Sequence, residues 1–295
     1  MKLTKHQTAT GPRWAVDGHA LSVTTTLATL LALGADDMAR TLESASGASG
    51  ASGASGPIDG TTLPPIEPLQ EVWASGVTYL RSRDARKAES SVADVYQKVY
   101  DAERPELFMK AIGWRVITHG TPVHIRADST WNVPEPELVL VINAYGQIVG
   151  YTAGNDMSSR DIEGANPLYL PQAKMYNGSC ALGTEIVVCR ADAMRALPVT
   201  LEIHRPIGEV SGVSLTGGTR GKAQSSLVFS GETSINRMKR TLDELASYLY
   251  REMAFPNGAY LMTGTGIVPP ETFTLERGDI VMIRVGEVTL DNDVR

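Results

Sequence analysis

The chain has 295 residues, of which 42% are hydrophobic and 20% are charged, and its net charge is −6. A chain of this kind is globular and can bury about 75% of the surface of its unfolded state. Its scattered lysines and arginines form no basic patch, and no stretch approaches the roughly 20 apolar residues of a membrane span. We therefore expect neither a nucleic-acid partner nor a membrane partner.

The start of the chain and its two cysteines suggest a cytoplasmic protein. Residues Met1–Lys5 lead into polar residues instead of an apolar segment, so no secretory signal is visible. Cys180 and Cys189 lack the paired spacing of a metal site, which is typical of reduced thiols.

A Gly/Ala/Ser repeat at residues 46–56 divides the chain. Its side chains are too small to build a core, so we expect a flexible tract there. The sequence thus predicts a small N-terminal cap domain at 1–69 and a functional body at 70–295. Within the cap, Trp14–Val23 predicts a pair of short strands, and the leucines of Thr25–Leu42 recur at helical spacing.

The body is made mostly of short apolar runs separated by turn signals. One helix is predicted at Ser91–Glu103, and a strongly amphipathic helix is predicted at Ser234–Glu252. Strands are predicted, in chain order, at Val123–Arg126, Leu138–Ile142, Ile148–Thr152, Glu185–Cys189, Val199–His204, Ala259–Thr263 and Ile280–Val285. This order indicates an α+β fold dominated by strands, in the form of a mixed β-roll or distorted barrel.

Three carboxylates gather around one predicted hairpin. Alternate residues of an extended strand share a face, so Glu135 and Glu137 point the same way. A two-residue turn at Tyr145-Gly146 places Asp156 opposite Glu135, and a turn at Gly146-Gln147 places it opposite Glu137. Both registers keep the three acids on one face, where they repel unless they are protonated or bridged by a metal. Oxygen ligands alone favour magnesium, manganese or calcium over zinc or copper.

Three further segments carry a more specific signal, and they are Asp156–Glu163, Leu168–Lys174 and Gly178–Gly183. Together with the two glutamates, these segments resemble the fumarylacetoacetate hydrolase superfamily, and more closely its 2-keto-3-deoxy-pentonate dehydratase branch. The resemblance covers about residues 70–290. Its motifs are long, which distinguishes them from a lone Glu-x-Glu pattern.

The resemblance implies a fumarylacetoacetate hydrolase-like fold and a homodimer or homotetramer. It implies that magnesium is held by Glu135, Glu137 and Asp156, and the oxygen-only ligands allow manganese or calcium as substitutes. It places the catalytic lysine at Lys174 and the substrate loop at Thr263–Thr265, so that Thr265 is a candidate substrate contact.

The chemistry of such a site follows from its parts. A divalent ion that holds the carboxylate and keto oxygens of a 2-oxo acid stabilises an enolate, so the neighbouring carbon becomes acidic. A desolvated lysine loses part of its preference for the charged form. Lys174 can therefore remove the proton or stabilise the enolate.

The hydrolases of the superfamily also use a histidine and a glutamate on a lid to activate water. The corresponding segment here has Ser82 and Ala85 at the positions of that histidine and glutamate. The five histidines of the chain are dispersed along the sequence. Because neither side chain activates water, the site is left to expel a leaving group. On a 2-keto-3-deoxy sugar acid, that group is the hydroxyl at carbon 4, so the chain is predicted to be a dehydratase.

Glu106 is the candidate acid that protonates the expelled hydroxyl, because this position is implicated in the dehydratase branch. A surface glutamate at a helix end is the alternative. Lys110, four residues further on, is predicted to neutralise Glu106 or to bind the substrate carboxylate.

Three more residues are candidate substrate contacts. Tyr79 and Arg83 either contact the sugar acid from the lid or face solvent. Arg160 matches a substrate-binding or scaffold arginine of the family, with a structural pair to Asp161 or Glu163 as the alternative.

The preferred hypothesis is a magnesium-dependent lyase of oxidative pentose breakdown, which dehydrates a 2-keto-3-deoxy-pentonate to 2,5-dioxopentanoate, the semialdehyde of 2-oxoglutarate. One alternative is a hydrolase that cleaves a carbon-carbon bond of acylpyruvates or related diketo acids. Another is a protein that binds metal and 2-oxo acids without turnover. No residue in the sequence distinguishes the stereoisomers at carbon 4.

Overall fold

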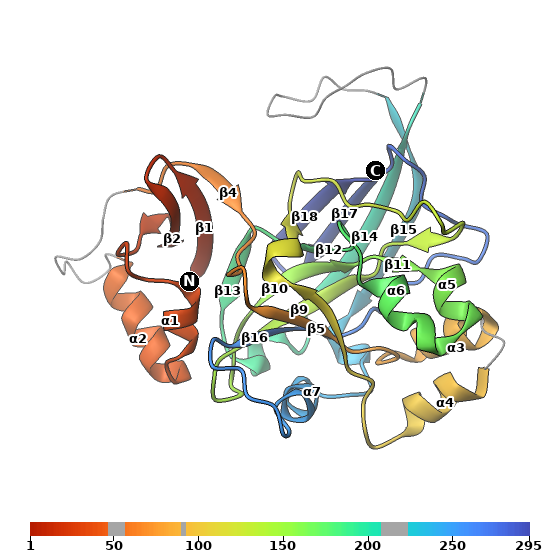
Figure 1. The fold of residues 1–295 in the computed structure, drawn as a ribbon, viewed down its shortest axis with the longest axis horizontal. Coiled ribbons are helices and arrows are strands. Elements are labelled where there is room, and N and C mark those ends of the chain that lie inside the picture. The colour runs from red at the N-terminus through yellow and green to blue at the C-terminus, as the bar shows by residue number, and fades with distance from the viewer. Residues whose placement is uncertain (47–56, 90–92, 208–223) are drawn as a thin grey trace.

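The computed structural model describes residues 1–46, 57–89, 93–207 and 224–295. It has an α+β fold dominated by strands, as the sequence predicts, with two main sheets and helices around them (Figure 1). The Gly/Ala/Ser tract predicted at 46–56 lies outside the described residues except for Ser46. None of the described helices is long and apolar enough to cross a membrane.

The larger sheet has twelve strands, and its main path runs β3-β2-β1-β13-β10-β9-β16-β5-β6. Strand β4 pairs with β1, and β12 pairs with both β10 and β7. The bounds are β1 (Lys2–Thr8), β2 (Gly11–Val16), β3 (His19–Ala20), β4 (Thr61–Leu63), β5 (Glu71–Ala74), β6 (Phe108–Ile112), β7 (Ile117–Thr118), β9 (Pro136–Ile142), β10 (Ile148–Asp156), β12 (Cys180–Leu182), β13 (Glu185–Val188) and β16 (Ala259–Met262). Because β1 pairs with β13, the first strands share a sheet with the body; the division near residue 69 stays a prediction.

A four-stranded sheet has the order β15-β14-β17-β18 and packs against β9 and β10. A two-stranded ribbon joins β8 to β11. The bounds are β8 (Asn132–Val133), β11 (Ser158–Ser159), β14 (Pro198–Pro206), β15 (Ser225–Ser234), β17 (Ile280–Val285) and β18 (Val288–Asp293).

Strand β9 is buried on both faces, which explains its continuous apolar sequence. Its even-numbered residues, such as Leu140, join the core cluster that contains Leu201 of β14. Its odd-numbered residues Val139 and Val141 join a second cluster with the leucines of the first helix. Glu135 and Glu137 share the parity of this second set, so the strand directs them to the same side as Val139.

Seven α-helices are described, and four of them, α3 to α6, gather at the end of the molecule away from α1 and α2 (Figure 1). The bounds are α1 (Leu27–Leu31), α2 (Ala35–Ala45), α3 (Leu80–Glu89), α4 (Ala93–Asp101), α5 (Arg160–Ala165), α6 (Leu170–Lys174) and α7 (Leu242–Leu249). Single 3-10 turns lie at Gly113–Arg115, Pro167–Tyr169, Ala191–Met194 and Ile235–Arg237.

The hairpin between β9 and β10 has the first of the two predicted registers. Gly154 pairs with Glu137, and the amide of Asp156 donates to the carbonyl of Glu135 at 3.0 Å, so Asp156 lies opposite Glu135. The turn itself differs from the prediction, because the loop has three residues and ends in Gly146 at φ +75°. A bulge between Ile148 and Gly150 then restores the register.

Two element predictions are wrong. The helix predicted at Ser234–Glu252 begins only at Leu242, because β15 extends to Ser234 and pairs there with Pro198. The true helix start is a capping box in which Thr241 accepts from the amide of Glu244. The strand predicted at Val123–Arg126 is reduced to a single bridge from Val123 to Val294.

The helix spacing at Thr25–Leu42 corresponds to two helices instead of one, α1 and α2, because Gly34 adopts an extended conformation between them. The helix predicted at Ser91–Glu103 is confirmed as α4, Ala93–Asp101. The predicted strand Ile280–Val285 is confirmed with the same bounds as β17.

Candidate active site

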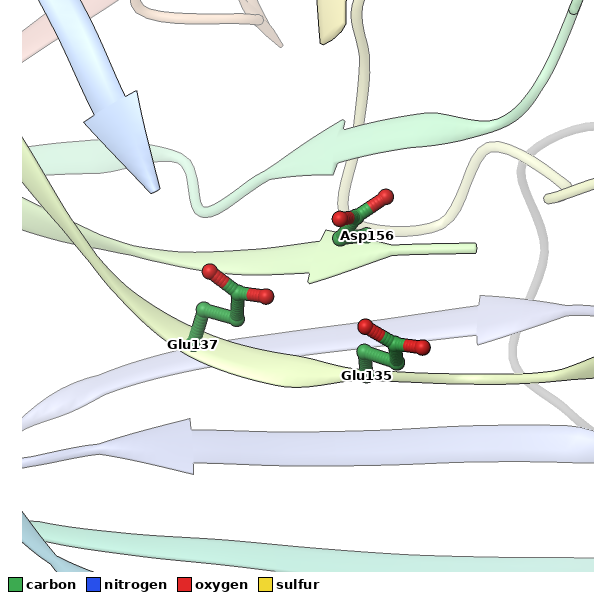
Figure 2. Close-up of side chains that lie close together, drawn as sticks. All are labelled: Glu135, Glu137 and Asp156. Carbon is green, nitrogen blue, oxygen red and sulfur yellow. The ribbon is translucent and has the colours of Figure 1, made fainter. Parts of the chain in front are cut away.

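Three carboxylates form the centre of the candidate site. Glu135 lies just before β9 and Glu137 lies within it, while Asp156 ends the neighbouring strand β10; Figure 2 shows the three side chains gathered on one side of these strands. Each side chain offers an oxygen that lies within 4.8 Å of the others, and all three residues are buried. The predicted cluster is therefore present in the fold.

Burial raises the pKa of the Glu137 carboxyl well above its ordinary value, and the nearby charges of Asp156 and Glu135 raise it further. The ammonium of Lys174 and the amide of Gly264 act in the opposite direction without cancelling this shift. Three buried acids of this kind are costly unless a cation compensates them.

The dimensions of the cluster fit a hard cation. Two ligands of one ion lie at most twice the metal–oxygen distance apart, which is about 4.2 Å for magnesium and about 5 Å for calcium. The three carboxylate oxygens lie within 4.8 Å of one another, a spacing of the order that a single ion of either kind spans. The donors are carboxylate oxygens only, which suits either ion.

Lys174 lies at the end of α6 and is 2% exposed. Its Nζ donates to Glu135 Oε2 at 2.9 Å and to Asp156 Oδ2 at 3.1 Å, so the ammonium bridges two of the three acids. Arg160, at the start of α5, donates from Nη2 to the other oxygen of Glu135 at 3.2 Å. The sequence thus places a lysine and an arginine against the acid cluster from two short helices.

A small cavity joins Glu106 to this cluster. Glu106, Thr265 and Lys174 line the same cavity as Glu135 and Asp156, although they come from distant parts of the chain. Its volume is about 20 Å³, enough for roughly one water molecule. Among the described residues that line it there is no histidine.

The Glu106 carboxylate lies against Gly76, where an added Cβ would come 2.1 Å from Glu106 Oε2. Ser75 also holds this segment, because its hydroxyl donates to the carbonyl of Glu106 at 2.9 Å. Glu106 therefore lines the cavity from a fixed backbone, and its side chain is partly buried; its role as the acid stays a prediction.

The other predicted substrate contacts lie at different distances from the cavity. Thr265 is in its wall, and Tyr79 lies beside it in the wall of a larger neighbouring groove, 3% exposed. Arg83 points elsewhere: its guanidinium pairs with Asp84 and stacks on the ring of Tyr100 at 5.1 Å. The structure thus brings Thr265 to the site and leaves Arg83 outside it.

Some of the groups at the site carry no signal in the sequence. The amide of Gly264 donates to Glu137 Oε2 at 2.6 Å, and backbone donors cannot be seen in a sequence pattern. Phe108 and Leu170 form apolar walls of the cavity. Glu163 accepts from Ser158 at 2.9 Å and also lines the cavity.

Gly264 should not tolerate a side chain. Its φ is +90°, and an added Cβ would lie 2.1 Å from Thr78 Oγ1 and 2.9 Å from the carbonyl of Ser75. We expect Gly264→Ala to lower the unfolding free energy by about 1–3 kcal/mol from strain and to reduce turnover by displacing the amide from Glu137. Urea unfolding and initial rates measure the two effects.

Gly278→Ala is the matched control, because Gly278 has φ +93° but open space around the Cβ position. Its unfolding free energy should fall only by the cost of the strained backbone, and its turnover should equal that of wild type. Equal turnover in both variants would contradict a role for the Gly264 amide.

The chain belongs to the family described as fumarylacetoacetate (FAA) hydrolase C-terminal, which it matches over residues 71–295. A probable 2-keto-3-deoxyxylonate dehydratase of Haloferax volcanii is 44% identical over 227 residues, which are 76% of this chain and 72% of the relative. A 2-dehydro-3-deoxy-D-arabinonate dehydratase of Saccharolobus solfataricus is 40% identical over 232 residues, 76% of this chain and 70% of the relative.

Among solved structures, a 2-keto-3-deoxy-D-arabinonate dehydratase complexed with magnesium and 2,5-dioxopentanoate superposes with a TM-score of 0.77 at 32% identity. The match covers 100% of this chain and 99% of that one. A fumarylacetoacetate hydrolase from Exiguobacterium antarcticum has a TM-score of 0.65 at 20% identity, a likeness of fold alone. The predicted family and fold are confirmed.

Proposed function

We propose that the protein is a magnesium-dependent hydro-lyase, which converts a 2-keto-3-deoxy-pentonate into 2,5-dioxopentanoate and water. The observation that carries the proposal is that two members of the acid cluster, Glu135 and Asp156, line one cavity together with Lys174 and Glu106. The described lining of this cavity has no histidine. The two curated relatives bear names of dehydratases that act on such sugar acids, and one similar structure holds magnesium and 2,5-dioxopentanoate.

Glu135, Glu137 and Asp156 would hold the magnesium ion, which supplies a Lewis acid that polarises the 2-oxo group when it is bound. Lys174 lies within hydrogen-bonding distance of two of these acids, so its Nζ is close to where a chelated 2-oxo acid must lie. We assign Lys174 the removal of a proton from carbon 3, or the stabilisation of the enolate oxygen.

Glu106 would then donate a proton to the hydroxyl that leaves carbon 4. The proton from carbon 3 and the hydroxyl from carbon 4 together make the water that is lost. The unsaturated product tautomerises to the semialdehyde, so atoms and electrons balance without a redox partner. Ser82 supports this reaction over hydrolysis, because its hydroxyl donates to the carbonyl of Tyr79 and is no base for water.

Substrate entry requires the walls of the site to move. A pentonate is much larger than the cavity of about 20 Å³, which is the size of roughly one water molecule. Thr265 and Arg160 are proposed to contact the sugar acid, and Tyr79 is proposed to border it. Arg83 would do so only if α3 moved.

The direct test offers purified protein a panel of 2-keto-3-deoxy-pentonate isomers with and without magnesium. Formation of 2,5-dioxopentanoate without carbon-carbon cleavage supports the proposal. Two fragments from an acylpyruvate would support the hydrolase, and binding of pyruvate with magnesium but no turnover would support the binding protein.

Replacing Glu106 by glutamine should lower kcat by about 10²–10⁴-fold, because the amide cannot protonate the leaving hydroxyl. Glu103→Gln, at an exposed glutamate nearby, is the control and should keep wild-type turnover. A Glu106→Gln variant with near-normal kcat would remove Glu106 from the mechanism.

A further inference from the structure

Lys110 on β6 is among the most completely buried side chains of the protein, with 1% of its surface exposed. Its Nζ lies 2.6 Å from Asp156 Oδ1, an ion-pair contact, and donates to the carbonyl of Met157 at 3.0 Å. The same ammonium donates to the backbone carbonyl of Lys174. One buried charge thus contacts a candidate metal ligand, the residue that follows it and the backbone of the candidate base.

This arrangement uses most of the hydrogen-bonding capacity of the ammonium. An ammonium has three N–H donors and no acceptor, and Lys110 donates to the carbonyls of Met157 and Lys174. Asp156 Oδ1 contacts the ammonium as an ion pair, and this oxygen has no hydrogen-bond partner among the described residues. Removing a donor from a buried carbonyl would be costly. Lys110 does not line the cavity, so it lies away from the place expected of a group that binds the substrate carboxylate, one of the two roles predicted for it. The other role, neutralising Glu106, stays a prediction.

The Lys174 carbonyl has a second donor. The hydroxyl of Ser179 donates to it at 2.8 Å, and the carbonyl of Ser179 accepts from the amide of Met157 at 3.0 Å. The contacts of Lys110 and Ser179 thus connect the end of β10 to the end of α6. Both residues therefore hold the backbone beneath Asp156 and Lys174.

We propose that Lys110 is a positioning residue that fixes the Asp156 carboxylate and the Lys174 backbone relative to each other. The inference rests on the proposed function, because Lys174 and Asp156 matter there as the base and the metal ligand. Ser179 supports the same carbonyl as an uncharged partner. Neither residue touches the reacting atoms.

The test is a double-mutant cycle of Lys110→Met, Ser179→Ala and the double variant, with kcat and KM measured at saturating magnesium. Each single change should lower kcat by about 10–100-fold, with KM for the pentonate changed less than threefold. The double variant should lose less than the product of the two single losses, because both residues hold one carbonyl.

Two outcomes of the complete mutant cycle would overturn the proposal. A KM raised tenfold or more with kcat unchanged in Lys110→Met would assign Lys110 to the substrate instead. Losses that multiply in the double variant would mean that the two residues do not act through the same carbonyl. If Lys110→Met does not fold, Ser179→Ala alone must show the fall in kcat at constant KM, and a normal kcat there would refute the proposal.

A measurement without turnover separates this inference from the proposed function. Amide hydrogen exchange should be faster in Lys110→Met than in wild type for peptides that cover residues 156–160 and 170–180. Lys5→Met is the matched control, a buried lysine that contacts Ile66 and Glu67 and should leave those peptides unchanged. Unchanged exchange in Lys110→Met would refute the positioning role, whereas inactivity of wild type towards every pentonate would refute only the proposed function.

Discussion

Asp156→Asn is expected to remove nearly all dehydratase activity, on the order of a thousandfold in kcat/KM, because the Lewis acid contributes several kcal/mol to the transition state. Asparagine keeps the shape of the side chain but removes one of the three negative charges that a hard cation needs. The same change withdraws an acceptor from Lys174 and an ionic partner from Lys110. Titration with Mn²⁺ followed by electron paramagnetic resonance, alongside initial rates, measures both losses.

Asp161→Asn provides the control five residues further along. The Asp161 carboxylate accepts from the hydroxyl of Ser129 and from the amide of Thr130, and it does not line the cavity. This variant should bind Mn²⁺ and turn over substrate as wild type does. Full activity of Asp156→Asn, or equal losses in both variants, would show that the acid cluster is not the metal site.

The acid cluster could be predicted from the sequence because it depends on short-range geometry. Glu135 and Glu137 share a face through the period of an extended chain, and a tight turn brings Asp156 back to them. The turn type could not be predicted: a three-residue loop and a bulge replace the two-residue turn. The bulge compensates for the extra loop residue, so the predicted register is correct although the predicted turn is not.

The helix predicted at Ser234–Glu252 failed because tertiary pairing overrode helical spacing. Ile235 and Met238 recur at helical intervals, yet the preceding residues pair with β14 as a strand of the smaller sheet. That strand pairing brings together residues some thirty positions apart, and local periodicity contains no information about it. The capping box at Thr241 was the local signal for the true start.

The rest of the site depends on contacts between distant segments. Glu106 faces the cavity because Gly76 leaves room for its carboxylate, and Lys174 reaches Glu135 across 39 positions of sequence. Spacing cannot predict such contacts, so the resemblance to the family supplied these candidates. Arg83 is a candidate only through its place on the predicted lid, and its guanidinium stacks on Tyr100 instead. The direction of a long side chain on a helix is set by packing, which the sequence does not show.

Lys174→Met is the second change with a large expected effect, a fall in kcat of about 10²–10⁴-fold, because methionine fills the buried space but cannot move a proton. The ammonium contacts Glu135 and Asp156, so its removal takes one positive charge from the site and should preserve or strengthen Mn²⁺ binding. This pattern, binding kept and turnover lost, distinguishes Lys174→Met from Asp156→Asn.

Isotope exchange then separates the two roles assigned to Lys174. In deuterated water the wild type should exchange hydrogen at carbon 3 of the substrate, as followed by nuclear magnetic resonance, and Lys174→Met should lose this exchange if the lysine is the base. If exchange persists while dehydration is lost, the ammonium acts on the enolate oxygen and another group takes the proton. Lys98→Met, at an exposed lysine of α4, should change neither rate, and normal dehydration by Lys174→Met would exclude both roles.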